Sequence, residues 1–186
     1  MLGRTPIEAY SSFVEPIQEA LNTITVGRLL LARESGGIRV DSPLNLSLNG
    51  GMPAPLRSAA PGSMFVEVNL RVRIAALDFE RFRYQCFQIG YWYRFFDTDL
   101  DEIVAFHWTP DVSSPERHYP HLHVGHIVVR QSSAFQGRFH KLHIPTGRIS
   151  AMHLVRLAIE EFGVNVRPGM DRAAVLADLN RTIGDA

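Results

Sequence analysis

The sequence contains one cysteine, one lysine and no long run of apolar residues. Cys86 alone cannot form an intramolecular disulfide, and it cannot supply a zinc site built from several cysteines. No segment reaches the roughly 20 consecutive apolar residues that a membrane-spanning helix needs. Met1–Ser12 also lacks the basic start and the apolar stretch of a signal peptide. These absences predict a cytoplasmic protein with no membrane partner.

A net charge is also missing, since Lys+Arg and Asp+Glu number 19 each. A neutral chain has no overall attraction to nucleic acid or to an anionic membrane surface. Hydrophobic residues make up 46% and charged residues 20%, which is typical of a globular protein with a buried core. The chain of 186 residues is therefore predicted to form a single domain, 1–186, of the α+β class.

The N-terminal region has the pattern of a helix. Thr5 is a suitable N-cap, Pro6 fits the first helical position, and apolar residues recur at spacings of three and four up to Ile24. Pro16 lies inside this pattern and has no N–H to donate, so we expect it to kink or split the helix.

Two further helices are predicted near the C-terminus. The first covers Ser150–Phe162, with Ser150 as its cap and Gly163 directly after its end. The second begins after the cap Asp171 and extends to about Thr182.

Four segments in the middle of the chain have strand patterns. Apolar side chains alternate with others from Val66 to Ile74, which is the period of a half-buried strand. Three more strands are predicted at Phe82–Phe96, Glu102–Trp108 and His121–Arg130. Because turn and loop residues separate these segments, we expect an antiparallel β-meander packed against an N-terminal helix and two C-terminal helices.

The segment 41–63 is rich in Pro, Gly, Ser, Asn and Ala, and it follows two short predicted strands at Val26–Arg33 and Ile38–Val40. Loops of this length are uncommon in compact domains, and they are often functional or disordered. We therefore predict a mobile loop at 41–63.

All eight histidines lie between His107 and His153. In His121-Leu122-His123 the two imidazoles are two residues apart, so on a strand they share one face. His107 lies on the preceding predicted strand and joins them if the two strands pair in the right register. His140 and His143 belong to a segment without predicted secondary structure, so their geometry stays open.

The histidine-rich region is more basic than the rest of the chain. Five basic residues face two acids there, a local charge of +3: Arg117, Arg130, Arg138, Lys141 and Arg148 against Asp111 and Glu116. A positive pocket with paired imidazoles suits a phosphate-bearing ligand.

The first hypothesis is therefore a histidine-dependent phosphodiesterase or ribonuclease that acts on RNA or a nucleotide. In this hypothesis His121 and His123 are the general acid and base, and Arg117 stabilises the developing charge. His107, His118 and Arg148 are then candidates for binding the substrate.

The same imidazoles support other interpretations. His107, His121 and His123 are three nitrogen ligands that suit a divalent metal such as zinc, with one position left for water. The site then belongs either to a metal-dependent hydrolase or to a module that binds a metal or a small anion without catalysis. A third interpretation is a protein-interaction domain in which the histidines have no chemical role.

Two other features concern aromatic and thiol groups. Tyr91, Trp92 and Tyr93 are able to stack on bases, and alternation predicts that either Trp92 or the two tyrosines point into the core. Cys86 has no basic partner at a recognisable spacing, so we expect a buried, unreactive thiol.

The layout from Val66 to His123, about a third of the chain, resembles the TumE-type toxins of bacterial toxin–antitoxin pairs and their relatives. The similar features are the long alternating strand, the aromatic strand Tyr91–Phe96, the acidic turn Asp97–Asp99, the strand ending at His107-Trp108, and the segment Pro120-His121-Leu122-His123. The resemblance implies an RNA-directed activity that an antitoxin-like partner protein restrains.

Overall fold

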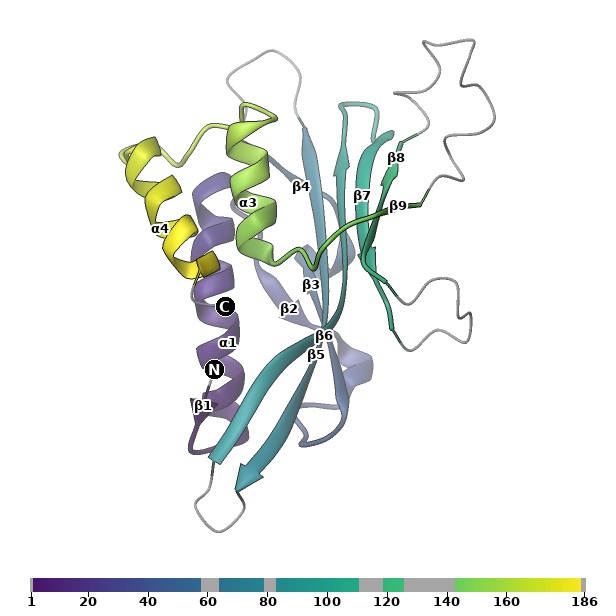
Figure 1. Cartoon of the computed structure of the whole chain (residues 1–186), viewed down its shortest axis with the longest axis vertical. Coiled ribbons are helices and arrows are strands. Elements are labelled where there is room, and N and C mark those ends of the chain that lie inside the picture. Colours follow the sequence, from purple (N-terminus) through teal and green to yellow (C-terminus); the bar gives the residue numbers. More distant parts are fainter. Residues whose placement is uncertain (1, 58–63, 79–82, 111–118, 126–142, 185–186) are drawn as a thin grey trace.

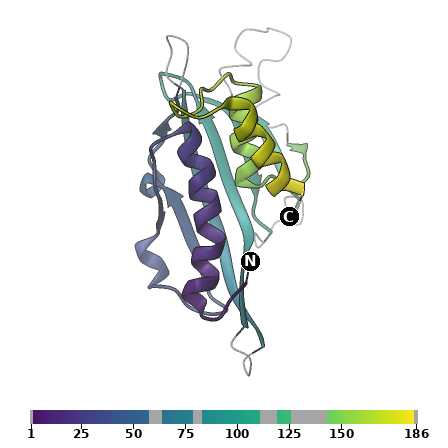
Figure 2. The same ribbon diagram turned by 90° about the vertical axis from the view of Figure 1, so that its left-hand side faces the viewer.

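The computed structural model describes residues 2–57, 64–78, 83–110, 119–125 and 143–184. Its centre is one antiparallel sheet in which the main path of paired strands runs β2-β3-β5-β6-β7-β8-β9, while β1 pairs with β6 and β4 with β5. The α-helices of the described residues lie on one side of this sheet, and the last of them packs against the helix before it, as the two perpendicular views in Figure 1 and Figure 2 show. The predicted α+β class and the meander with one N-terminal and two C-terminal helices are confirmed.

The strands are β1 (Leu2–Gly3), β2 (Leu29–Leu31), β3 (Pro43–Leu48), β4 (Ala54–Pro55), β5 (Phe65–Asp78), β6 (Arg83–Phe96), β7 (Glu102–Trp108), β8 (His121–Val124) and β9 (Ile144–Pro145). The helices are α1 (Pro6–Ile24), α3 (Ala151–Glu160) and α4 (Arg172–Gly184), with 3-10 turns η1 (Arg33–Ser35) and η2 (Asn49–Gly51).

The predicted helix signals act as expected, apart from the proline. The Thr5 hydroxyl accepts a hydrogen bond from the Glu8 backbone at 3.1 Å and so begins α1. The helix continues through Pro16 to Ile24, so of the two effects expected of the proline, a kink or a split, the split does not occur. Ser150 caps α3, and the side chain of His153 completes a capping box with it.

The core lies between the sheet and the helices. Every second residue of β5 is buried, from Val66 to Ile74, which confirms the predicted alternation. On β6 the tyrosines Tyr91 and Tyr93 point into this core, whereas Trp92 is 41% exposed. Since neighbouring residues of a strand face opposite sides, Trp92 belongs to the sheet face that carries no described α-helix.

The prediction of a loop at 41–63 needs a correction, because this segment contains the strands β3 and β4. Leu44, Leu46 and Leu48 are fully buried, and they alternate with Asn45 and Ser47. Apolar burial at every second position stabilises a strand although the segment is rich in turn-forming residues, and β3 pairs with both β2 and β5. Residues 58–63 lie outside the described part of the chain.

The two short strands predicted before it are only partly present. The first is limited to Leu29–Leu31, and Arg33–Ser35 forms a 3-10 turn instead. Of Ile38–Val40, only Val40 pairs, in an isolated bridge with Ile74. Among the described residues, no helix is long and apolar enough to cross a membrane.

Candidate functional site

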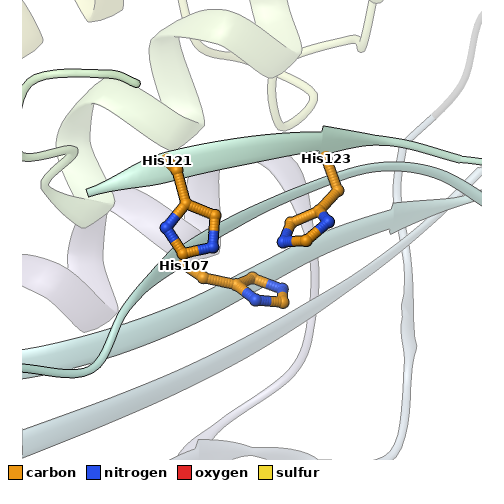
Figure 3. A group of neighbouring side chains, drawn as sticks. All are labelled: His107, His121 and His123. Carbon is orange, nitrogen blue, oxygen red and sulfur yellow. The ribbon is translucent and has the colours of Figure 1, made fainter. Parts of the chain in front are cut away.

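The pairing of β7 with β8 brings three histidines to one face of the sheet. His107 is the cross-strand partner of His121, and His123 lies opposite Ala105. Cross-strand partners point to the same side, and so do residues two apart on one strand. The three imidazoles therefore point toward one another, as Figure 3 shows.

The rings are close enough to share one small ligand. The ring centroids of His107 lie 5.6 Å from His121 and 4.7 Å from His123, and those of His121 and His123 are 4.9 Å apart. One ring nitrogen from each residue lies within 4.8 Å of the other two. Three histidines thus lie close enough to hold a metal ion, and the expectation that His107 joins the pair is confirmed.

His121 is oriented by the backbone. Only 3% of the residue is exposed, and its Nδ1 lies 2.9 Å from the carbonyl oxygen of Tyr119. Because a carbonyl can only accept, Nδ1 carries the proton of this hydrogen bond, and in the neutral tautomer with this bond Nε2 holds the lone pair. Metal-binding histidines commonly have this arrangement, in which a carbonyl fixes the ring and the tautomer.

His107 provides a buried nitrogen that has no partner in the described structure. Its Nε2 is buried and makes no hydrogen bond. The pKa of His107 is lowered to about 3, first by burial and then by the nearby His123, His121, Arg94 and His143, in that order. The ring is therefore neutral at physiological pH. A neutral buried imidazole nitrogen without a partner costs about 1–3 kcal/mol, which a ligand at that atom would offset.

A fourth histidine, His143, joins the cluster from the segment before β9. Its ring centroid lies 4.7 Å from that of His121 and 4.3 Å from that of His123. The register of β8 with β9 continues to this position, since Ile144 pairs with Leu122 and the next positions are His143 and His123. The sequence shows no strand pattern there, so only this pairing identifies the residue.

Trp92 and Arg94 on β6 flank the histidines. The sequence pointed to Trp92 only as one of three rings able to stack on bases, and it did not point to Arg94. The Trp92 ring lies 4.2 Å from that of His107, its cross-strand partner. The guanidinium carbon of Arg94 lies 5.3 Å from the Trp92 ring centroid. Arg94 forms an ion pair with the buried Glu67, and the two side chains are also cross-strand partners. Glu67 therefore holds a cation beside the cluster.

Of the other predicted residues, Arg148 is described by the structure and does not join this group. The prediction that Arg148 binds the substrate beside the histidines needs a correction. Its guanidinium carbon lies 4.1 Å from the ring centroid of Trp108. Trp108 follows His107 on β7 and points to the opposite face, so Arg148 is separated from the histidines by the sheet. The predicted catalytic Arg117 and the predicted substrate-binding His118 lie outside the described residues.

Comparison with protein-family models gave no match, and comparisons with curated proteins and with solved structures gave none either. The chemistry of the histidine cluster is therefore the basis for a function.

Proposed function

We propose that this protein is a metal-dependent hydrolase of phosphodiesters in which His107, His121 and His123 bind one divalent transition-metal ion. The observation that carries the proposal is the convergence of these three imidazoles, with one nitrogen of each within 4.8 Å of the others. The unpartnered Nε2 of His107 and the fixed tautomer of His121 support it, because both leave a lone pair available for a metal.

Zinc is the metal that fits these ligands best. Imidazole nitrogens suit zinc, whereas magnesium and calcium prefer oxygen ligands. Within the described part of the chain, no carboxylate belongs to the group of three histidines. Three histidines and one open position are the ligand set of catalytic zinc sites, in which the metal lowers the pKa of a water molecule to about 7.

A phosphodiester is the proposed substrate because the guanidinium of Arg94 lies beside the histidine cluster. Arg94 lies close enough to His107 to lower the pKa of that ring by its charge. A guanidinium at this place is able to stabilise the negative charge that develops on a phosphate during attack. Water adds to the phosphorus and gives up a proton, the bond to the leaving oxygen breaks, and that oxygen takes up a proton. Among the described residues His143 is a further imidazole beside the cluster, and it is able to pass the proton from the water to the leaving oxygen.

A metal-free phosphodiesterase with His121 and His123 as acid and base is the second candidate. The positive charge of Arg94, which disfavours a cation, supports it. The burial of His121, which limits direct contact with a substrate, speaks for the metal instead. For either candidate function, the resemblance to TumE-type toxins suggests RNA as the substrate and an antitoxin-like protein as the partner.

The test uses untagged protein, because a histidine tag would itself bind metal. We expect about one equivalent of zinc in the purified protein by elemental analysis. His107→Ala, His121→Ala and His123→Ala should lose it, whereas His153→Gln should keep it. His153 lies outside the cluster, and glutamine retains the capping-box function at that position.

Hydrolysis of RNA and of an activated phosphodiester is measured on the same samples. Removal of zinc with a chelator should abolish cleavage, and added zinc should restore it. Cleavage that resists the chelator and is lost only in the histidine variants would favour the metal-free candidate. If the wild type neither contains nor takes up a metal and cleaves no phosphodiester, the proposed function is wrong.

A further inference from the structure

A groove of about 680 Å³ lies on the sheet face that carries no described α-helix. It extends over β2, β3, β5 and β6, and Asn45, Ser47, Asn69, Arg71 and Trp92 line it. The side chains of these five residues are on the same face as the histidines, because they are linked to them by cross-strand pairing. The groove and the cluster thus lie on the same face of the sheet.

A single row of cross-strand partners connects the two. The pairs are Ser47 with Asn69, Asn69 with Trp92, Trp92 with His107, and His107 with His121. Strands of a sheet lie roughly 4.8 Å apart, so this row of five residues spans roughly 19 Å. That length accommodates several nucleotides of an extended single strand, and it is much longer than the diameter of a small ion.

The chemistry of the lining favours an anionic ligand that carries a flat ring. Two arginines, Arg33 and Arg71, line the groove, and no acidic side chain occurs among the described residues that line it. Two asparagines and a serine offer hydrogen-bond donors and acceptors for a polar ring edge. Trp92 is 41% exposed, although an indole of this size is usually well covered.

We propose that this groove binds a nucleotide of a single-stranded nucleic acid next to the bond that is cleaved. The base stacks on Trp92, the amide side chains of Asn45 and Asn69 contact its edge, and Arg71 binds a phosphate. The inference rests on the proposed function, since Trp92 contacts both the groove and His107 and so places the following phosphodiester at the histidine cluster.

Base stacking and phosphate binding make different contributions, which two variants separate. Stacking on an aromatic side chain contributes roughly 1–3 kcal/mol per base, so Trp92→Leu should weaken binding about 10-fold and Trp92→Phe much less. Arg71→Gln should weaken binding and also reduce its dependence on salt, because one phosphate contact is lost. Arg181→Gln is the matched control, since Arg181 is an exposed arginine of α4.

The experiment measures the binding of a short fluorescent single-stranded RNA, its DNA counterpart and inorganic polyphosphate by fluorescence anisotropy. Zinc content and RNA integrity are checked in every sample. We expect both nucleic acids to bind more tightly than polyphosphate, and we expect Trp92→Leu to remove this preference while its zinc content stays at the wild-type level. Tighter binding of RNA than of DNA would identify the 2′-hydroxyl as a further contact and supports the inference.

Two results would overturn the inference. One is equal affinity of the wild type for polyphosphate and nucleic acid, and the other is unchanged nucleic-acid binding in both Trp92→Leu and Arg71→Gln. Absence of zinc with intact, Trp92-dependent binding would instead contradict only the proposed metal function. The two proposals therefore fail by different measurements on the same samples.

Discussion

Gly125 lies so close to the backbone of Glu102 that a Cβ atom on Gly125 would be 1.6 Å from the Glu102 carbonyl oxygen. The backbone N–H of Gly125 also donates to the carbonyl of Ile103 at 2.7 Å, directly after β8 ends. Close approach of two backbones without a side chain between them is what glycine permits at this position. The contact fixes β8 against β7, and this pairing sets His107 opposite His121.

Gly125→Ala should therefore disturb the pairing of β7 with β8. The added methyl group meets backbone atoms that cannot rotate away, so we expect a loss of at least about 2 kcal/mol in the free energy of unfolding. Zinc content should fall as well, because the register of the histidines depends on this pairing. Gly147→Ala is the control, since a Cβ there would meet nothing within 4 Å. Equal stability of the two variants in urea unfolding would show that the contact is not needed.

Strand β3 should behave as part of the core although its composition resembles a loop. Leu46→Ala removes a side chain that is 1% exposed, and we expect a loss of about 2–5 kcal/mol in the free energy of unfolding. Ser47 is the next residue of β3 and points to the sheet face that carries no described α-helix. Ser47→Ala should therefore change the free energy of unfolding by less than about 0.5 kcal/mol. Chemical denaturation of both variants measures the difference. A small effect of Leu46→Ala would mean that the segment is a loop after all.

The ion pair between Glu67 and Arg94 should stabilise the protein more than an exposed pair does. Glu67 is 7% exposed, whereas the side chain of Arg94 is 30% exposed, so solvent screens part of the interaction. We expect Glu67→Gln to reduce the free energy of unfolding by about 2 kcal/mol, because Arg94 loses the nearer of its two carboxylate partners, Glu67 and Glu102.

The exposed pair of Arg156 with Glu160 on α3 provides the matched comparison for Glu67→Gln. Glu160→Gln should change the free energy of unfolding by less than about 0.5 kcal/mol. Thermal unfolding of the two variants at low and high salt distinguishes them, and equal losses would contradict the expected role of burial.

The single thiol should be unreactive in the folded protein. Cys86 is 1% exposed, and burial raises its pKa to about 11, so little thiolate is present near neutral pH. Because the folded state holds this proton more tightly than the unfolded chain, the thiol reduces stability only as pH rises from about 9 toward 11. A thiol reagent at pH 8 should react with one thiol per chain in denaturant and with almost none in the native protein. Rapid reaction of the native protein would exclude this burial.

Local patterns predicted most elements because alternation and capping act between residues that are near in the chain. The strand at Glu102–Trp108 has the predicted bounds, and the helix after Ser150 begins at its predicted cap. Composition misled at 41–63, where turn-forming residues obscured the alternation of Leu44, Leu46 and Leu48. The prediction for Cys86 as a buried residue is also confirmed.

The sequence by itself determined that His121 and His123 share a face, because the side-chain period of a strand is a local property. Tertiary structure decided which residues meet them: His107 and Trp92 through the pairing of β6, β7 and β8, and His143 through the pairing of β8 with β9. It also placed Arg148 on the opposite side of the sheet. Strand register depends on contacts between segments distant in the chain, and no local pattern of residues carries that information.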